Sequence, residues 1–410
     1  MNNHVIKSAH RCLQCKNPLC EKGCPISTPI KKMIEMFNDG EIKEAGKMLF
    51  ENNPLSVICS LVCPHEKHCE GHCVLGRKGE PVNIGGIENY ISDYHLNRMK
   101  CENLSKGERS VAIIGGGPAG ISLAIILAKK GYDITIFDGH DKIGGVLRYG
   151  IPDFRLNKNI LDILTSKMKD LGIKIRPNIM VGKGITFEDL FRDGFGAIFI
   201  GTGVWIPRAL GIKGESLGHV HYAINYLKNP DVYDLGKKVV VIGAGNVAMD
   251  VARTAIRKGA DDVRILYRKG FDEMPARKDE IEFAKIDGVR FETYKTPISI
   301  DKQGVNYNLV NKVQDGDTIK FETDDSVDYF IDADSVLIAV SQNPMDLIVE
   351  NNEGISTTRH GLLVTDECGR TTRDGVFASG DVVTGAKTVV EAAAFSKRAA
   401  MAIEKYFDEK

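Results

Sequence analysis

The stretch VAIIGGGPAG, residues 111–120, decides the fold because an apolar strand runs directly into a glycine-rich turn. A helix is expected over 121–130 and a second strand over 132–138, which complete a βαβ unit of the kind that binds a dinucleotide. The second strand ends in Asp138, whose carboxylate can accept hydrogen bonds from ribose hydroxyls. The residues expected to face a pyrophosphate are Gly115, Gly117, Pro118, Ala119 and Gly120.

The pattern occurs a second time as VVVIGAGNVA, residues 239–248, with a helix expected over 247–258 and a strand over 263–268. One such turn would be a weak signal, whereas two in one chain indicate two nucleotide-binding domains. Asn246 and Asp250 lie at the start of the helix, where either side chain could instead cap it. The residues expected at this second site are Gly243, Gly245, Asn246, Val247, Ala248 and Asp250.

The last strand of this second unit ends in the basic pair Arg268 and Lys269 instead of a carboxylate. A carboxylate at that position favours NAD by binding the ribose 2′-hydroxyl, whereas basic side chains suit the 2′-phosphate of NADP. The sequence therefore favours NADP(H), with NADH as the alternative. Arg277 is a third candidate for the phosphate, although it could equally belong to a solvated helix face over 276–282.

Two further segments extend the first site. GGVLRYGIP, residues 144–152, is too glycine-rich for a helix and too apolar for an idle loop, and GVFASGD, residues 375–381, puts Asp381 ahead of a helix starting near Thr388. Together they resemble the FAD site of flavoproteins with two dinucleotide-binding domains, which implies Asp381 on the ribityl–phosphate part and the helix start at the flavin pyrimidine edge. An ordinary turn at Asp381 is the alternative. The residues expected here are Gly145, Val146, Arg148, Gly150, Arg155, Thr202, Gly380, Asp381, Thr388 and Val389.

Eight of the ten cysteines lie within the first 73 residues. They form two runs, Cys12-x2-Cys15-x4-Cys20-x3-Cys24 and Cys59-x3-Cys63-x5-Cys69-x3-Cys73. The first run has the form of a ferredoxin run with one lengthened spacer, so its first three cysteines would hold one cluster and Cys24 would ligate a second. By count, eight thiolates satisfy two 4Fe–4S clusters. A pair of structural zinc sites is the alternative, which the long spacers disfavour.

Residues 1–105 are expected to form a small helical module. Apolar residues recur at 30, 33, 34 and 37, which predicts an amphipathic helix. With so few core residues, the module is expected to depend on its metal to stay folded. The histidines between the cysteines, His65, His68 and His72, are expected at the surface.

The composition excludes several functions. Lys plus Arg number 54 and Asp plus Glu 55, so no strong field indicates nucleic acid or an anionic membrane as a partner. The N-terminus MNNHVIKSAHR has no apolar core of a signal peptide, and no apolar stretch reaches the roughly 20 residues of a membrane span. We therefore expect a cytoplasmic protein, in which dense cysteines hold metal more often than they form disulfides.

The order of these motifs resembles a known family. The cysteine runs, IGGGPAG, GGVLRYGIPDFRL, the second GxGxxA, YRKGFDEMPAR and GVFASGD are similar in order to the small (beta) subunit of glutamate synthase. They are equally similar to the N-terminal half of dihydropyrimidine dehydrogenase and to the large subunit of bifurcating ferredoxin:NADP oxidoreductases. The compact length is most similar to the stand-alone bacterial dihydropyrimidine dehydrogenase subunit, and the resemblance covers essentially the whole chain.

The resemblance implies a set of cluster ligands that differs from the one favoured by spacing. One cluster would take Cys12, Cys15, Cys20 and Cys73, and the other Cys24, Cys63, Cys69 and the carboxylate of Glu88. Cys59 would then be a bystander, whereas spacing alone favours Cys59 as the eighth ligand. A carboxylate ligand would change the charge of the cluster and hence its reduction potential.

The expected fold is α/β with two Rossmann-like domains, the second inserted in the first, after an α-helical iron–sulfur domain. The expected bounds are 1–105 for the iron–sulfur domain, 106–212 with 342–410 for the FAD domain and 213–341 for the NAD(P)H domain.

The expected function is to oxidise NADPH at FAD and to pass electrons through two 4Fe–4S clusters to a partner subunit in a hetero-oligomer. Hydride transfer requires no acid–base residue, so no catalytic side chain is expected. A disulfide reductase needs a cysteine pair beside the flavin, and the absence of cysteine between Cys101 and Cys368 disfavours that class. The alternative is a self-sufficient reductase of ferredoxin or of a small acceptor.

Overall fold

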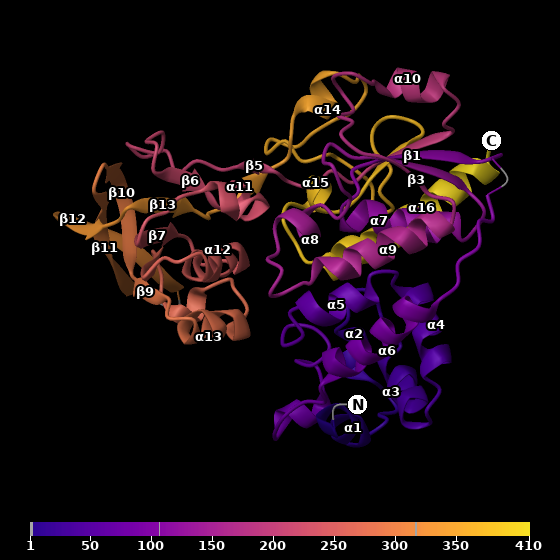
Figure 1. Ribbon diagram of the computed structural model, residues 1–410, viewed down its shortest axis with the longest axis horizontal. Coiled ribbons are helices and arrows are strands. Elements are labelled where there is room, and N and C mark those ends of the chain that lie inside the picture. The colour runs from indigo at the N-terminus through magenta and orange to yellow at the C-terminus, as the bar shows by residue number, and fades with distance from the viewer. Residues whose placement is uncertain (1–2, 106, 316–317) are drawn as a thin grey trace. The chain divides into compact units, whose positions relative to one another are not determined.

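The computed structural model describes residues 3–105, 107–315 and 318–410 (Figure 1). The chain divides into two compact units. The first contains Met1–Arg148, Asp153–Val204 and Asn343–Lys410, and the second contains Tyr149–Pro152 and Trp205–Gln342. The second unit is thus inserted between parts of the first; the three domain bounds expected above stay predictions.

The first unit begins with a helical module whose core is apolar. The predicted amphipathic helix is present, and its Ile30, Met33, Ile34 and Phe37 are all buried. They pack with residues of the last helix, among them Ile87. The elements of the module are α1 Asn3–His10, α2 Leu19–Lys22, α3 Ile30–Asn38, α4 Ile42–Asn52, α5 Ser56–Val62, the 3-10 helix η1 Val74–Arg77 and α6 Ile84–Arg98.

A five-stranded parallel sheet forms the rest of the first unit, in the order β15-β4-β1-β2-β3. Its strands are β1 Ser110–Ile114, β2 Asp133–Phe137, β3 Lys174–Arg176, β4 Ala197–Ile200 and β15 Val376–Ala378. Helix α16 (Val389–Asp408) packs on α7 (Pro118–Ala128) and on α5, and α9 (Lys158–Asp170) packs on α6. Figure 1 shows α7, α9 and α16 between the sheet and the helical module. Shorter elements are α8 Val146–Tyr149, α10 Phe187–Arg192, α14 Leu347–Glu350 and α15 Asp381–Thr384.

The second unit has its own parallel sheet, in the order β6-β13-β7-β8-β9. Its strands are β6 Val220–Tyr222, β7 Lys238–Ile242, β8 Asp262–Tyr267, β9 Arg290–Thr293 and β13 Ser335–Ile338. Its helices are α11 Ala223–Lys228, α12 Asn246–Arg257, α13 Lys278–Ile286 and the 3-10 helices η2 Pro230–Val232 and η3 Phe271–Glu273. The two strand–turn–helix–strand units predicted from the sequence are therefore both present, one in each unit.

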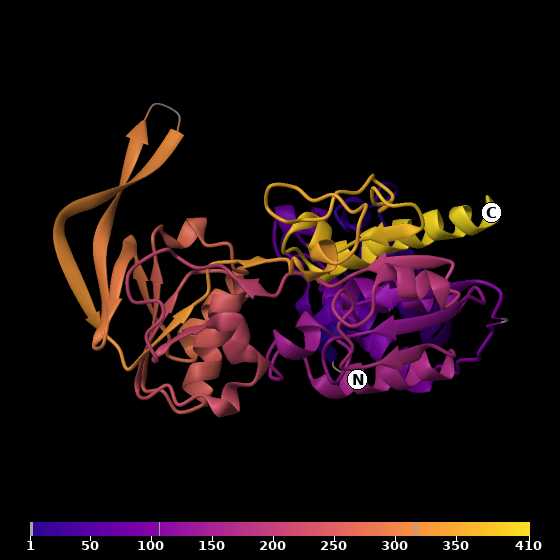
Figure 2. The same ribbon diagram turned by 90° about the horizontal axis from the view of Figure 1, so that it is seen from above.

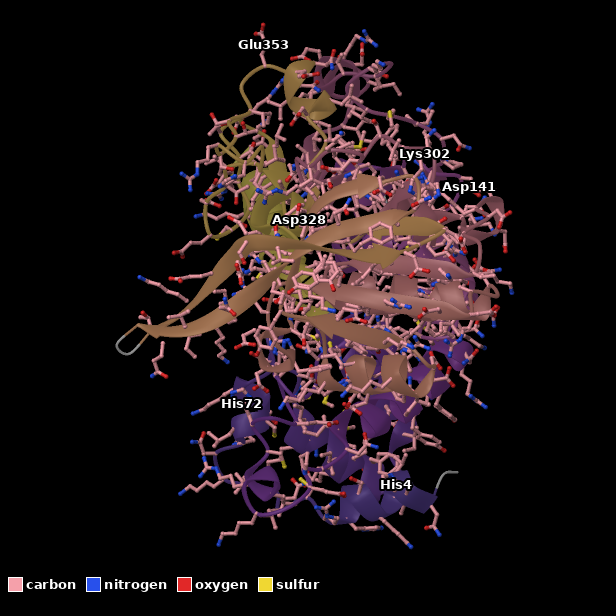
Figure 3. All side chains as sticks on the ribbon, turned by 90° about the vertical axis from the view of Figure 1, so that its left-hand side faces the viewer. His4, His72, Asp141, Lys302, Asp328 and Glu353 are labelled. Atoms are coloured by element: carbon pink, nitrogen blue, oxygen red, sulfur yellow. The ribbon has the colours of Figure 1, made fainter. Side chains whose placement is uncertain are left out.

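An antiparallel sheet, β10-β11-β12, completes the second unit. Its strands are β10 Lys295–Asp301, β11 Gly304–Asp315 and β12 Thr318–Asp332, and Figure 2 shows β11 and β12 continuing as a two-stranded ribbon. Lys302 and Asp328, labelled in Figure 3, lie in the β10–β11 turn and in β12. A short two-stranded sheet joins β5 (Ile206–Pro207) to β14 (Gln342–Asn343).

The expectation that residues 144–152 contain no helix is wrong over Val146–Tyr149, which form α8. Gly144 and Gly145 adopt φ angles of 131° and 52° and make the turn, so a helix can begin directly after them. Leu147 of this helix is fully buried. No helix among the described residues is both long and apolar enough to cross a membrane.

Candidate functional site

The first glycine turn places backbone without side chains at the N-terminus of α7. Gly115 has a φ of 98°, and α7 begins at Pro118 with Gly117 in the cap position. A Cβ atom on Gly145 would lie only 2.8 Å from the Cα of Gly117, so the two loops meet through backbone alone. A Cβ on Gly120 would lie 2.0 Å from the carbonyl oxygen of Gly115. This close approach at a helix N-terminus is the arrangement that accommodates a pyrophosphate.

Asp138 lies buried immediately after β2, where the sequence predicts it. Its Oδ2 accepts a hydrogen bond from the backbone N–H of Gly116 at 2.6 Å, and its Oδ1 accepts one from His140 N–H at 2.8 Å. The carboxylate therefore holds the glycine turn in place. Its expected contact with ribose stays a prediction.

The segment around Asp381 lies beside the same turn. A Cβ on Gly380, which has a φ of 78°, would be 3.0 Å from the Cβ of Ala119 in the first turn of α7. Asp381 Oδ1 accepts a hydrogen bond from Lys387 N–H at 3.1 Å, and burial raises the pKa of Asp381 to about 6. Residues more than 250 positions apart in the sequence are thus adjacent at one site.

Helix α16 starts where it was predicted, with Thr388 as its cap. The hydroxyl of Thr388 accepts a hydrogen bond from Glu391 N–H at 3.3 Å, and the Glu391 carboxylate accepts one from Thr388 N–H at 3.0 Å. This capping box uses the backbone donor of Thr388 itself. The positive end of the helix dipole at Val389 still favours negative charge in front of it.

The remaining residues predicted for this site vary in position. Arg148 turns back on its own loop, where its Nε donates to the carbonyl of Ile143 at 2.9 Å and its Nη2 to Asp162 Oδ1 at 2.6 Å. Gly150 belongs to the second compact unit rather than the first. Val146, Arg155 and Thr202 are in the first unit; Arg155 and Thr202 are half-buried.

The second glycine turn repeats the geometry of the first. Gly243 has a φ of 124°, and a Cβ there would lie 2.3 Å from the carbonyl oxygen of Ala339. Helix α12 begins at Asn246, with Gly245 as its cap. The Oδ1 of Asn246 accepts a hydrogen bond from Arg277 N–H at 2.9 Å and so does not cap its own helix. Asp250 is buried within α12, and Val247 and Ala248 lie in its first turn.

The three basic residues predicted beside the adenosine ribose differ in exposure. Arg268 is exposed at the end of β8, whereas the ammonium of Lys269 lies 4.9 Å from the ring centre of Phe321 in β12. Arg277 is only 8% exposed, and α13 begins after it at Lys278. The alternative interpretation of Arg277 as part of a solvated helix face is therefore wrong.

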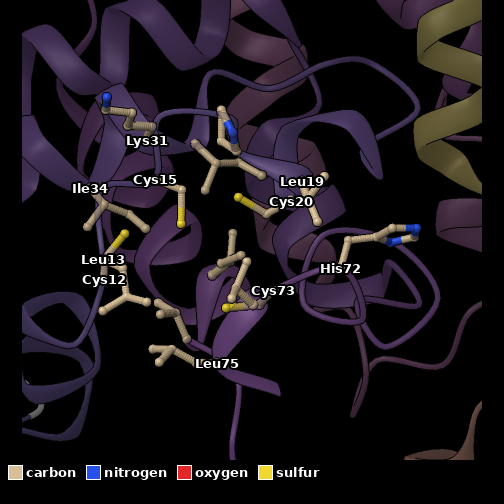
Figure 4. A pocket seen from close by; sticks show the side chains of 15 residues that line it. Cys12, Leu13, Cys15, Leu19, Cys20, Lys31, Ile34, His72, Cys73 and Leu75 are labelled. Carbon is tan, nitrogen blue, oxygen red and sulfur yellow. The ribbon is translucent and has the colours of Figure 1, made fainter. Parts of the chain in front are cut away.

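Four thiols of the helical module converge on one pocket. Figure 4 shows the side chains of Cys12, Cys15, Cys20 and Cys73 around it, while His72 turns away. The walls are apolar and include Ile30 and Ile34 of α3. Burial raises the pKa of the Cys20 thiol to about 11. Four thiolates around one apolar pocket are the donor set that a 4Fe–4S cluster takes.

A second group of side chains combines the half-buried Cys24 with two buried thiols and a buried carboxyl group. Cys63 and Cys69 are 7% and 6% exposed, and Glu88 of α6 is 7% exposed. Glu88 acts electrostatically on Cys24, Cys63 and Cys69, whose pKa values all rise; burial is the largest cause for Cys24 and Cys69, and the hydrogen bond with Cys59 for Cys63. Burial also raises the pKa of Glu88 to about 7, and Ser56 Oγ donates to its Oε1 at 2.7 Å.

The donor set of the second group fits a cluster, because it offers three thiols and one carboxylate from separate segments. Among the described residues, no three His, Cys, Asp or Glu side chains are grouped to hold a single metal ion. Of the three nearby histidines expected at the surface, His72 is exposed but His65 and His68 are half-buried.

Cys59 lies beside this second group. It is 2% exposed, shares a hydrogen bond with the thiol of Cys63, and its Sγ accepts one from Asn53 Nδ2 at 3.3 Å. No sequence signal indicates the contact of Asn53 with Cys59. The same holds for the contact of Lys397 in α16 with Asn52, where Nζ lies 2.9 Å from Oδ1. The Thr388-x-x-Glu391 pattern of the capping box could have been found from the sequence.

Comparisons with known proteins agree with this division of the chain. Residues 1–100 match the family model described as dihydropyrimidine dehydrogenase domain II, 4Fe–4S cluster, and residues 109–395 match that of the pyridine nucleotide-disulphide oxidoreductases. The glutamate synthase [NADPH] small chain of Halomonas elongata is 33% identical, over 98% of this chain and 90% of its own. The NAD-dependent dihydropyrimidine dehydrogenase subunit PreT of Salmonella typhimurium is 31% identical, over 99% and 95%.

A solved structure shares the fold alone. FprA from Mycobacterium tuberculosis superposes with a TM-score of 0.65 at 18% identity, over 73% of this chain and 85% of its own.

Fold, site and relatives together define an NAD(P)H-dependent oxidoreductase with an FAD-type nucleotide site and a 4Fe–4S domain. More particularly, the chain belongs to the pyridine nucleotide-disulphide oxidoreductase family, among the relatives of the glutamate synthase small chain.

Proposed function

We propose that this protein is an electron-input subunit, which oxidises NADPH at FAD and sends electrons through two 4Fe–4S clusters to a partner reductase or synthase subunit. The carrying observation is that two groups of cluster-type donors share one compact unit with the first nucleotide site. Relatives named as subunits of glutamate synthase and of dihydropyrimidine dehydrogenase support the role. A hetero-oligomer in the cytoplasm is the expected setting.

We infer that Cys12, Cys15, Cys20 and Cys73 hold one cluster and that Cys24, Cys63, Cys69 and Glu88 hold the other. The first set is supported by the common pocket, and the second by the buried carboxyl group of Glu88 among three thiols.

The two donor sets differ in access, which supports an order of transfer. The second set lies in the part of the module that packs on α16, because α5 contacts that helix and Lys397 reaches Asn52. The four thiols of the first set are only half-buried, and the neighbouring Leu13 is 60% exposed. Electron transfer weakens steeply with distance, so the half-exposed set is the side from which a partner would draw electrons.

NADPH is proposed as the preferred nucleotide on the basis of charge. Arg268, Lys269 and the buried Arg277 supply three positive groups near the end of β8 and the start of α12, and no carboxylate ends that strand. The relatives' names include both NADPH and NAD, so the preference of this chain must be measured.

The first experiment is an anaerobic titration of the purified protein with NADPH, followed by EPR and by iron and zinc analysis. About eight irons per flavin, with signals from reduced clusters, are expected for two 4Fe–4S clusters. A bleached flavin with zinc and no EPR signal would reject the electron-input role. Steady reduction of ferredoxin or a small acceptor without any partner would favour the alternative, a self-sufficient oxidoreductase.

A further inference from the structure

The buried thiol of Cys59 has a defined place next to a proposed cluster ligand. Cys59 lies one helical turn before Cys63, whose backbone N–H donates to the Cys59 carbonyl at 2.9 Å. Helix α5 ends at Val62, and Cys63 then adopts an extended conformation with a ψ of 143°. Cys63 thus leaves the helix toward Cys69 and Glu88, while Cys59 stays within it and shares a hydrogen bond with the Cys63 sulfur.

Asn53 holds the sulfur of Cys59 in place through a hydrogen bond of its own. Asn53 is 1% exposed, and its Oδ1 accepts a hydrogen bond from Leu55 N–H at 3.0 Å, which orients its amide. The Nδ2 group must then point the other way, and it donates to Cys59 Sγ at 3.3 Å. Between the two free thiols the bond raises the pKa of Cys63, which is the effect of Cys63 donating to Cys59. A Cys63 thiolate bound to iron has no hydrogen left to donate, so the hydrogen of Cys59 is the one available for this bond when a cluster is present.

We propose that Cys59 is a positioning residue and not an iron ligand: its thiol donates a hydrogen bond to the sulfur of Cys63 and raises the reduction potential of the cluster that Cys63 holds. A hydrogen bond to a ligating sulfur withdraws negative charge from the cluster, which favours its reduced, more negative state. The inference rests on the proposed function, because it requires a cluster at Cys63. It assigns a role to the cysteine on which spacing and resemblance disagree.

The test compares Cys59→Ala and Cys59→Ser in the full-length holoprotein, with Cys101→Ala as a matched control. Cys101 is a half-buried thiol outside both groups of cluster donors. The readouts are iron per flavin and an EPR-monitored redox titration of both clusters. Cys59→Ala should keep its iron and shift one midpoint to lower potential, because the donor is lost. Cys59→Ser should shift it less, because the hydroxyl still donates, and Cys101→Ala should change neither.

Two results would overturn the inference. Loss of iron in both Cys59 variants, with the wild-type complement intact, would make Cys59 a ligand; the electron-input role would survive. Unchanged midpoints in Cys59→Ala would mean that the thiol only fills space. Wild-type protein without two EPR-active clusters would instead refute the proposed function, and the role of Cys59 with it. Asn53→Leu gives a second route, since it frees the Cys59 sulfur and should shift the same midpoint as Cys59→Ala.

Discussion

Buried ionisable side chains are the most informative single residues of this molecule. Glu88 lies in α6, acts electrostatically on three thiols from other segments, and accepts a hydrogen bond from the hydroxyl of Ser56. A buried carboxylate without a cationic partner is costly, and natural proteins accept that cost where the group binds a metal or does chemistry.

Glu88→Ala should therefore remove iron from one cluster and leave the other in place. The reason is that the carboxylate is the fourth donor of the buried set. Iron analysis and EPR of the purified variant measure this directly. Asn89→Ala serves as the control, because Asn89 is the next residue of α6 and its Nδ2 donates to the hydroxyl of Ser60. Full iron content in Glu88→Ala, together with loss in Cys59→Ala, would show that cysteine spacing predicted the ligand correctly.

Nucleotide preference is also set by individual charges. Replacing Arg268 and Lys269 with glutamate should lower the NADPH to NADH ratio of kcat/KM, because two charge-assisted contacts to a 2′-phosphate are lost. Each is worth about 1.5–3 kcal/mol, or roughly 10- to 150-fold. Lys302→Glu, a charge reversal in the β10–β11 turn, should leave the ratio unchanged (Figure 3). An unchanged ratio in the double variant would remove these residues from the phosphate site.

At the scale of elements, α16 depends on its capping box. Burial pushes the pKa of Glu391 upward, but hydrogen bonds from Thr388 and the positive charge of Lys387 outweigh it, and the net pKa is lowered. A carboxyl group whose pKa is lower in the folded than in the unfolded state stabilises the fold at any pH above its unfolded-state pKa. This contribution is lost as the pH falls through the folded-state pKa.

Thr388→Ala should thus lower the stability of the first unit by about 1 kcal/mol at pH 7, as for other helix caps. The difference from wild type should shrink below about pH 4, where Glu391 becomes protonated. Urea unfolding followed at both pH values measures the effect. Met401→Ala in the exposed middle of the same helix is the control. A difference that grows at low pH would contradict the role of the Glu391 carboxylate.

Sequence patterns predicted those elements whose residues interact locally. The strand–turn–helix units at 111–138 and 239–268 follow from glycine spacing and apolar runs, which act within about 30 residues. The start of α16 was likewise predicted near Thr388, shortly after the segment that ends in Asp381. Helix α8 did not, because two glycines at positive φ confine the turn to Gly144 and Gly145 and release the residues after them.

The less predictable parts of the site depend on contacts between distant segments. The grouping of Cys73 with Cys12, Cys15 and Cys20 is not apparent from spacing, which pairs cysteines within a run. It required the family resemblance, and the shared pocket is consistent with it. The burial of Arg277 is equally invisible in the sequence, since it is a property of the folded chain, in which the backbone N–H of Arg277 donates to Asn246, 31 residues away.

At the scale of the whole molecule, the helical module should depend on its metal. Its apolar core includes Cys69 and is packed against Cys12, Cys20, Cys24 and Cys73, whereas the central strands β1, β4, β7 and β13 of the two parallel sheets are almost entirely buried. Removing iron should therefore raise hydrogen exchange in α1–α6 and leave β7 and β8 of the second unit protected. Mass-spectrometric exchange of iron-free and holo protein tests this. Equal protection of α1–α6 in both forms would mean that apolar packing alone maintains the module.

The β11–β12 ribbon has a consequence for colloidal behaviour. Among the described strands, β12 is 15 residues long and has a neighbour on one side only, which leaves a row of backbone groups that could template another chain. Asp324, Asp325 and Asp328 stand along this edge, and the ladder shifts register between Tyr307 and Leu309. Like charges and an irregular edge oppose stacking of one copy on another, so these acidic residues keep the ribbon from seeding fibrils.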